Sequence, residues 1–481
     1  MGVGLHQDYH INNRQRDGEV KRPNIILINC DDLGYGDLGC YGSKVNKTPA
    51  IDRLARQGVI FSSFYMASSL CSPSRGAMLT GCYPRRIGFH KYKNSLGTVL
   101  FPGDNEGLNP SEITIASILK NAGYATRMVG KWHCGDQPEF LPTRFGFDGY
   151  YGLPYSNDMG MSFADDVDKK YQELFASFPP LPLIDGEQVV EEQPDQSTLT
   201  ERYVEQSVKF IRENKDRPFF LYLAHMHVHL PHMAPERFNK QSDNGPFGAA
   251  VECVDWATDV IMYELGRSGI ESNTIIIFTS DNGSVARLGA SNAPLRGAKG
   301  SCWEGGFRVP CIIRWPESVR GSTRYDDIVT SMDFLPTLAR ICSTDVPGDR
   351  IIDGIDISGI LTGGKNIQER VFYYYHKGDL CAVRRGRYKY FIDSPHYQEA
   401  LYDLEEDVSE SNDIIKRHPG IVKRLKETAE GCRDDLGDDL RMKKGKNRPI
   451  GWVEDPMTLT CYDPAHPYMI AMYDLSGGNC G

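Results

Sequence analysis

The chain of 481 residues contains no run of 18 or more apolar residues, so no segment is predicted to cross a membrane as a helix. It has no excess of basic residues, and its formal net charge of −10 argues against nucleic acid as a partner. None of its 13 cysteines forms a C-x-x-C pair and their number is odd, so neither a disulfide framework nor a zinc site is indicated. An anionic substrate would therefore need a local positive pocket within an acidic protein.

The N-terminal residues 1–21 are polar and lack the apolar segment of a signal peptide. We therefore expect a cytoplasmic location, or a secreted protein if a leader was removed. The chain is long enough for more than one domain.

Short apolar runs predict buried strands, and polar residues follow directly at their C-terminal ends. Residues 24–29 precede Asp31 and Asp32, residues 124–130 precede Lys131 and His133, and residues 274–280 precede Asp281 and Asn282. Helix-compatible segments at 48–58 and 111–122 alternate with such strands, which predicts an α/β sandwich. Because ligands of open α/β sheets bind at the carboxyl ends of strands, we expect these polar residues to share one edge.

The stretch Cys71-Ser72-Pro73-Ser74-Arg75 leads into a helix-compatible run that ends in Leu79-Thr80-Gly81. Pro73 suits the first turn of a helix, and Ser72 or Ser74 could cap its amides. Cys71 is therefore expected at a helix N-terminus close to Arg75, where a thiolate or a bound oxyanion would be stabilised. A buried cysteine beside a surface arginine is the alternative.

The string Cys-x-Pro-Ser-Arg followed by Leu-Thr-Gly resembles the signature of the type I sulfatases, of the arylsulfatase A and N-acetylgalactosamine-6-sulfatase kind. Further motifs extend the resemblance from about Pro23 to about Pro316. It implies an alkaline-phosphatase-like sandwich with a central, mostly parallel sheet and a smaller C-terminal α+β domain with an antiparallel sheet. On this basis we expect a polar extension at 1–22, a catalytic domain at 23–365, and the smaller domain with its tail at 366–481.

The resemblance also implies the site. A maturation enzyme would oxidise the signature cysteine to formylglycine, and a divalent cation would bind between the strand ends. Oxygen ligands favour Ca²⁺ or Mg²⁺ over zinc or copper, and the family favours calcium. The implied catalytic residues are Cys71, Arg75, Lys131, His133, His229 and Lys299, the implied metal ligands are Asp31, Asp32, Asp281 and Asn282, and Lys131, His229, Lys299 and Ser156 would contact the substrate.

Four histidines between positions 225 and 232 could suggest a transition-metal cluster. His225, His227 and His229 alternate, however, so they would line one side of an extended segment without the closed ligand set that zinc prefers. The resemblance selects His229 alone, as the residue near the leaving oxygen. The loop 89–109, an acidic insertion loop at 160–198 and the tail are candidates for substrate recognition.

These observations predict an enzyme that hydrolyses sulfate monoesters, on a sulfated sugar of the glycosaminoglycan type or on an aryl sulfate. One alternative is a phosphate or phosphonate monoester hydrolase of the same fold, since the ligand set barely separates two tetrahedral oxyanions. The other is a catalytically silent binding protein in which Cys71 stays unmodified.

Overall fold

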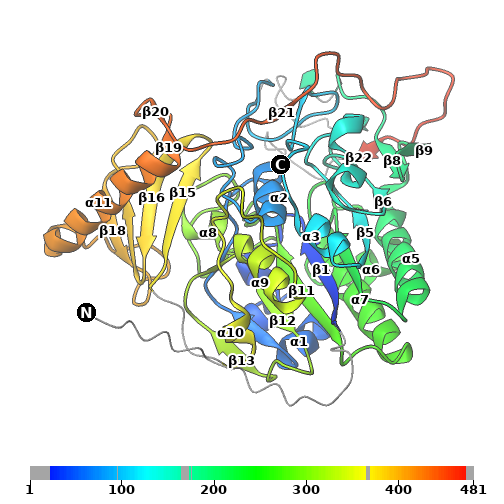
Figure 1. The fold of residues 1–481 in the computed structure, drawn as a ribbon. Coiled ribbons are helices and arrows are strands. Elements are labelled where there is room, and N and C mark those ends of the chain that lie inside the picture. Colours follow the sequence, from blue (N-terminus) through cyan, green and yellow to red (C-terminus); the bar gives the residue numbers. More distant parts are fainter. Residues whose placement is uncertain (1–21, 95, 164–172, 175, 364–368, 473–481) are drawn as a thin grey trace.

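A ten-stranded sheet forms the centre of the larger of two units in the computed structural model, which describes residues 22–94, 96–163, 173–174, 176–363 and 369–472 (Figure 1). Its strand order is β13-β2-β12-β11-β1-β10-β5-β6-β8-β9. The strands are β1 (Asn24–Cys30), β2 (Val59–Phe61), β5 (Ala125–Gly130), β6 (Gly149–Gly152), β8 (Pro182–Asp185), β9 (Gln188–Glu192), β10 (Phe219–Ala224), β11 (Thr274–Ser280), β12 (Cys311–Arg314) and β13 (Thr323–Tyr325).

The five central strands β11, β1, β10, β5 and β6 are parallel, as the strand–helix alternation predicts. Strand β1 is apolar on both faces because helices cover the sheet from both sides. Its Ile25 and Leu27 pack into one layer and its Ile26 and Ile28 into the other.

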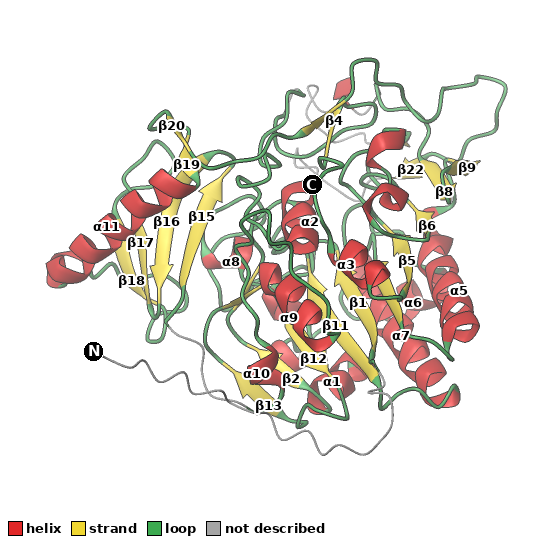
Figure 2. Ribbon diagram, in the orientation of Figure 1, coloured by secondary structure: helices red, strands yellow, loops and turns green. Residues whose placement is uncertain are grey.

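Helices form the two outer layers of the sandwich (Figure 2). The first layer contains α2 (Cys71–Thr80), α3 (Ile115–Asn121) and α9 (Phe334–Ile341), and the second contains α1 (Pro49–Arg56), α5 (Gln196–Asn214) and α7 (Gly245–Arg267). The remaining helices are α6 (Glu236–Gln241), α8 (Glu304–Phe307), α10 (Ser358–Leu361) and α11 (Pro419–Asp435).

The smaller unit is an antiparallel sheet with α11 packed against it (Figure 1). Its strands, in order, are β15 (Val371–His376), β16 (Asp379–Arg385), β17 (Tyr388–Phe391) and β18 (Ala400–Asp403). Four short apolar or aromatic segments separated by turns, at residues 371–375, 382–384, 388–391 and 401–402, predict strands at these places. The predicted domain boundary at 365 lies outside the described residues, and so does nearly all of the extension 1–22, so both stay predictions.

Buried charges join the two units. The ammonium of Lys389 on β17 lies 3.0 Å from Glu304 Oε1 and 2.8 Å from Glu410 Oε1, and none of these side chains is exposed. Glu304 also accepts a hydrogen bond of 2.7 Å from the Tyr374 hydroxyl on β15. Glu304 is the first residue of α8 and directly follows the loop that carries Lys299. The small sheet therefore holds the end of this loop in place.

Short strand pairs complete the fold. They are β3 (Phe64–Tyr65) with β14 (Val329–Thr330), β19 (Gly437–Asp438) with β20 (Lys443–Lys444), β4 (Glu106–Gly107) with β21 (Gly451–Trp452), and β7 (Ser162–Phe163) with β22 (Ala471–Met472). The last two pairs return the tail, red in Figure 1, to the large unit.

The expectation that residues 160–198 form only an insertion loop is wrong. Strands β8 and β9 lie within this range and extend the main sheet at its edge, and α5 begins before the range ends. Acidic and proline residues interrupt the apolar pattern that predicts strands in this range. The apolar stretch that remains, at residues 181–184, is short, but an edge hairpin needs no more. No helix among the described residues is both long enough and apolar enough to cross a membrane.

Candidate active site

The carboxyl ends of neighbouring parallel strands bring the expected polar residues to one edge of the sheet. Cys30 lies opposite Ser280, and Ala224 at the end of β10 lies opposite Gly130 at the end of β5. The residues that follow these strand ends therefore face a common space. Gly130 has a φ of +110° and its Cα lies so close to the Ala224 carbonyl that a Cβ would be 1.8 Å from the oxygen, so only glycine fits before Lys131.

Two site residues adopt left-handed backbone conformations. Asp32 has a φ of 60° and His133 a φ of 58°. Such conformations are uncommon for residues other than glycine and persist only where the surroundings hold them in place. Their position directly after β1 and β5 turns both side chains toward the strand-end space.

Cys71 is the first residue of α2, as predicted, and its side chain is buried. Its Sγ lies 3.5 Å from Asp31 Oδ1. Burial and the neighbouring Asp31 raise the pKa of the Cys71 thiol well above its usual value.

The expected serine caps are wrong. Neither Ser72 nor Ser74 caps α2. Ser72 Oγ accepts a hydrogen bond of 3.2 Å from the amide of Leu100, and Ser74 Oγ donates to the carbonyl of Asp281. The two serines attach the helix to neighbouring loops, and these tertiary partners replace the local hydrogen bonds that capping would use.

Arg75 is fully buried among the strand-end carboxylates. Its Nε and Nη2 lie 2.9 and 2.8 Å from Asp281 Oδ2, and Nη2 lies 3.3 Å from Asp31 Oδ2. Its Nη1 donates a hydrogen bond of 2.7 Å to the carbonyl of Lys131. Arg75 thus holds the carboxylates of Asp31 and Asp281 and the end of β5 in place relative to one another. Arg75 itself is not among the residues that line the pocket.

The two expected sulfate-binding lysines also contact carboxylates. Lys131 forms an ion pair with Asp31 and donates a hydrogen bond of 3.0 Å to Ser156 Oγ. The ammonium of Lys299 lies 2.8 Å from Asp32 Oδ1. Burial alone would raise the pKa of Asp31, but Lys131 and Arg75 hold it well below its usual range.

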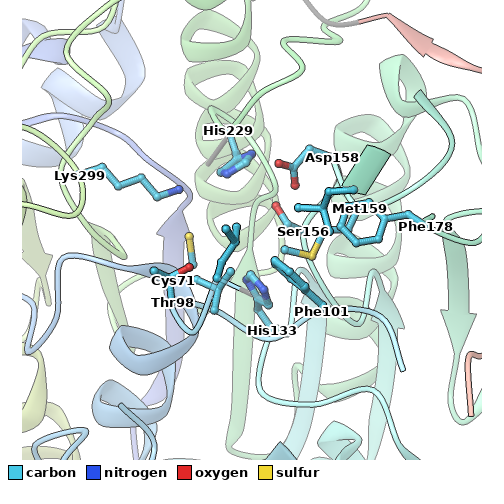
Figure 3. Close-up of a pocket in the computed structure, with 13 residues that line it drawn as sticks. Cys71, Thr98, Phe101, His133, Ser156, Asp158, Met159, Phe178, His229 and Lys299 are labelled. Carbon is cyan, nitrogen blue, oxygen red and sulfur yellow. The ribbon is translucent and has the colours of Figure 1, made fainter. Parts of the chain in front are cut away.

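The two expected catalytic histidines lie on opposite sides of the pocket (Figure 3). His133 Nε2 is 3.0 Å from the carbonyl of Leu100, and His229 Nδ1 is 2.7 Å from the carbonyl of Leu230. A carbonyl only accepts, so Nδ1 of His229 carries a proton, and Nε2 is left to face Asp32 Oδ2 at 3.7 Å. Burial and the charge of Lys299 lower the pKa of His229.

The other histidines of this segment do not follow the expected extended geometry. Residues 227–231 form a turn followed by bends after β10. His225, His227 and His232 are buried, and none of them lines the pocket. His229 is the one histidine of this segment that lines the pocket, and its selection stays a prediction.

The strand-end residues fit a hard divalent cation. Among the described residues, one group of at least three candidate ligands has all its donor atoms within 4.8 Å of one another, and it consists of Asp31, Asp32, Cys71 and His229. Asn282 adds a buried Oδ1 without a hydrogen-bond partner, while its Nδ2 donates to Asp32 Oδ1 at 2.7 Å. Burial and the charge of Asp31 raise the pKa of Asp281 to about 6, as expected for carboxylates crowded together. Oxygen donors of this kind suit Ca²⁺ or Mg²⁺.

The pocket extends from Cys71 and Lys299 past the two histidines to a group of apolar side chains (Figure 3). Cys71, His133, Ser156, His229 and Lys299 were predicted as site residues, and all five line it. Sequence reasoning did not name Thr98, Asp158 or the apolar residues, although the loop 89–109 and the insertion 160–198 were expected to contact the substrate. A polar end and an apolar end therefore share one pocket.

The comparisons with known proteins agree with this geometry. A family model described as Sulfatase matches residues 23–343, and one described as N-sulphoglucosamine sulphohydrolase, C-terminal, matches residues 298–435. Arylsulfatase A of Homo sapiens is 36% identical over 453 residues, which cover 85% of this chain and 87% of the relative. N-acetylgalactosamine-6-sulfatase of Rattus norvegicus is 37% identical over 385 residues, which cover 77% of this chain and 72% of the relative.

A solved structure shows the same fold. The crystal structure of Ps i-CgsB in complex with k-i-k-neocarrahexaose superposes with a TM-score of 0.75 at 32% identity and covers 85% of this chain and 92% of that chain. The predicted alkaline-phosphatase-like sandwich with a separate small antiparallel sheet is therefore confirmed. Because the family model covers most of the chain and the relatives match it over most of their length, the chain belongs to the sulfatase family and is a sulfuric ester hydrolase.

Proposed function

We propose that this enzyme hydrolyses sulfate monoesters through a formylglycine formed from Cys71 and a bound divalent cation, with Ca²⁺ favoured over Mg²⁺. The observation that carries the proposal is the convergence of Cys71, His133, Ser156, His229 and Lys299 on one pocket beside crowded carboxylates, with the buried Lys131 bonded to Ser156 Oγ behind it. Asp31, Asp32, Asp281 and Asn282 would hold the cation. A formylglycine-generating enzyme is the partner that this maturation requires.

The formylglycine and the cation would each supply one part of the chemistry. Hydrated formylglycine would offer one hydroxyl for attack on sulfur and a second for release of sulfate, and the cation would stabilise negative charge on the oxygens. The chain's own residues bind and orient the ester. Lys299 places its ammonium group at the polar end of the pocket, where it can balance the charge of the sulfonate oxygens. Lys131 contributes from behind through its hydrogen bond to Ser156, which lines the pocket. Arg75 acts through Asp31 and Asp281, whose carboxylates it holds in place.

His133 and His229 would transfer the protons in this reaction. The hydrogen bond from Nδ1 of His229 to Leu230 fixes the ring, so a second proton on Nε2 is the one available for the leaving oxygen. Asp32 Oδ2, 3.7 Å away, stabilises that second proton. His133 lies on the opposite side of the pocket, where it can accept a proton from the formylglycine hydrate (Figure 3).

The choice of sulfate over phosphate tests the proposal directly. We expect purified enzyme to hydrolyse nitrophenyl sulfate with a kcat/KM at least about tenfold above that for nitrophenyl phosphate, a difference of about 1.4 kcal/mol in the barrier. Faster turnover of the phosphate would favour the phosphate or phosphonate hydrolase instead. Binding of both esters without turnover by protein in which Cys71 stays an unmodified thiol would favour the silent binding protein.

The role of His229 predicts a dependence on the leaving group. General acids contribute on the order of 10²–10⁴-fold, and they matter most when the departing oxygen is strongly basic. His229→Ala should therefore slow hydrolysis of an alkyl or sugar sulfate far more than that of nitrophenyl sulfate. His225→Ala, which alters a buried histidine outside the pocket, should show no such dependence. Equal slowing of both ester types by His229→Ala would make the residue a binding group only.

The names of the relatives and of the neighbouring structure point to two classes of substrate. The names of the relatives include N-acetylgalactosamine-6-sulfatase and arylsulfatase A, and the neighbouring structure is a complex with k-i-k-neocarrahexaose. These names support either a sulfated sugar of the glycosaminoglycan type or an aryl sulfate. The expected cytoplasmic location receives no support from the comparisons and stays a prediction.

A further inference from the structure

The end of the pocket away from Cys71 and Lys299 is lined mainly by apolar side chains. Figure 3 shows Phe101, Met159 and Phe178 together on the side away from Cys71 and Lys299, with the two histidines between the two ends. Further apolar side chains complete this surface, which consists of Leu96, Val99, Phe101, Met159, Leu174 and Phe178. We call these six residues the apolar wall.

The apolar wall is held firmly on the side of the 96–101 loop. The amide of Phe101 donates a hydrogen bond of 2.7 Å to Asp104 Oδ2, and the carbonyl of Leu100 lies 3.0 Å from His133 Nε2. Lys377, in the turn between β15 and β16, donates a hydrogen bond of 3.1 Å to the carbonyl of Leu96. The wall is thus connected both to the catalytic residues and to the small unit.

An aromatic pair closes the wall across the pocket. The rings of Phe101 and Phe178 meet edge to face with centroids 5.6 Å apart and an interplanar angle of 73°. Phe101 is buried and Phe178 is partly exposed. The pair therefore places two aromatic rings at this end of the pocket, where such rings favour contact with a flat or cyclic apolar group.

The polar groups at this end do not suit a multiply sulfated sugar. Lys299 is the only lysine or arginine among the described residues that line the pocket, and it already contacts Asp32. Asp158 lies on the side of the wall, so a second sulfate group there would meet a carboxyl group (Figure 3). The hydroxyl groups of a sugar would lose water against the six apolar side chains without gaining hydrogen bonds from them.

We propose that the natural substrate is a monosulfate of an apolar ring alcohol, and that the apolar wall selects it over a sulfated sugar. The inference rests on the proposed sulfate ester hydrolysis and narrows its substrate class to an aryl or alicyclic sulfate. The wall would contribute through binding of the leaving group, whereas the chemical step would stay with the residues around Cys71. Phe178 is then a specificity-determining residue.

Two sulfate esters with the same type of leaving group test the proposal. Cyclohexylmethyl sulfate and methyl galactopyranoside 6-sulfate are both primary alkyl sulfates with a six-membered ring, so they differ mainly in the hydroxyl groups of the ring. We expect the kcat/KM of wild-type enzyme to be at least about tenfold higher for the cyclohexylmethyl ester, as is typical of discrimination by pocket contacts. A preference for the galactoside, or equal rates, would overturn the proposal.

A variant of Phe178 tests whether the apolar wall causes the preference for the cyclohexylmethyl ester. Phe178→Ser should lower kcat/KM for the cyclohexylmethyl ester about tenfold, mainly through KM, and leave the galactoside unchanged or improved. Tyr263→Ser, which alters an aromatic residue on α7 that is 68% exposed, is the control and should change neither rate. Equal losses for both esters in Phe178→Ser would contradict a role in selection.

The outcomes separate this proposal from the proposed function. If nitrophenyl sulfate is hydrolysed but the matched pair shows no preference, the wall proposal fails and sulfate hydrolysis stands. If protein with the aldehyde hydrolyses none of the three sulfates, both proposals fail.

Discussion

Replacing Cys71 with alanine should reduce turnover of nitrophenyl sulfate by roughly 10⁴-fold or more, as expected when a covalent nucleophile is removed. The variant should still fold, because alanine suits the first turn of α2 and only a sulfur atom is lost from the buried site. Turnover measured alongside thermal unfolding distinguishes loss of chemistry from loss of structure.

Cys311→Ala is the matched control. Cys311 is also fully buried, but it lies on β12 and does not line the pocket. It should lose a similar amount of stability and keep its activity. A Cys71→Ala enzyme that retains wild-type turnover would contradict any mechanism through position 71.

Removing the divalent cation should abolish activity and also lower the melting temperature. A ligand that binds only the folded state at about 100 times its Kd stabilises that state by about 2.7 kcal/mol. The loss should therefore be visible as a difference between unfolding in calcium and in chelator. Metal analysis should find calcium or magnesium, and zinc in place of both would overturn the assignment.

Asn282→Ala tests the position of the cation without changing the charge of the site. It removes a buried amide oxygen that has no hydrogen-bond partner, so the difference between calcium and chelator should become smaller than in wild type. Asn273→Ala, at the opposite end of β11, is the control and should keep the full difference. An unchanged difference in Asn282→Ala would move the cation away from this strand end.

The strand ends of the site could be predicted because each one is a local pattern. The apolar run of β1 followed by Asp31 and Asp32 specifies both a buried strand and its ligand-bearing end. The same logic located Lys131 after β5 and Asp281 after β11. The small sheet was also readable, since its strands alternate with short turns.

The partners of the side chains could not be predicted, because they depend on residues far apart in the sequence. Ser74 reaches the carbonyl of Asp281, about two hundred positions away, and Lys299 contacts Asp32. The strands β8 and β9 were missed for a related reason, since an edge hairpin acquires its stability from the sheet it joins. The apolar wall is assembled from separate segments, so no single stretch predicted it.

The mass of the tryptic peptide 57–75 reports the chemical state of residue 71, because Cys71 is the only cysteine of this peptide. We expect active preparations to contain a lighter peptide in which the thiol has become an aldehyde. This peptide should react with a hydrazide, and turnover should rise in proportion to its share. Full turnover by protein in which every such peptide carries an unmodified thiol would contradict a mechanism through formylglycine.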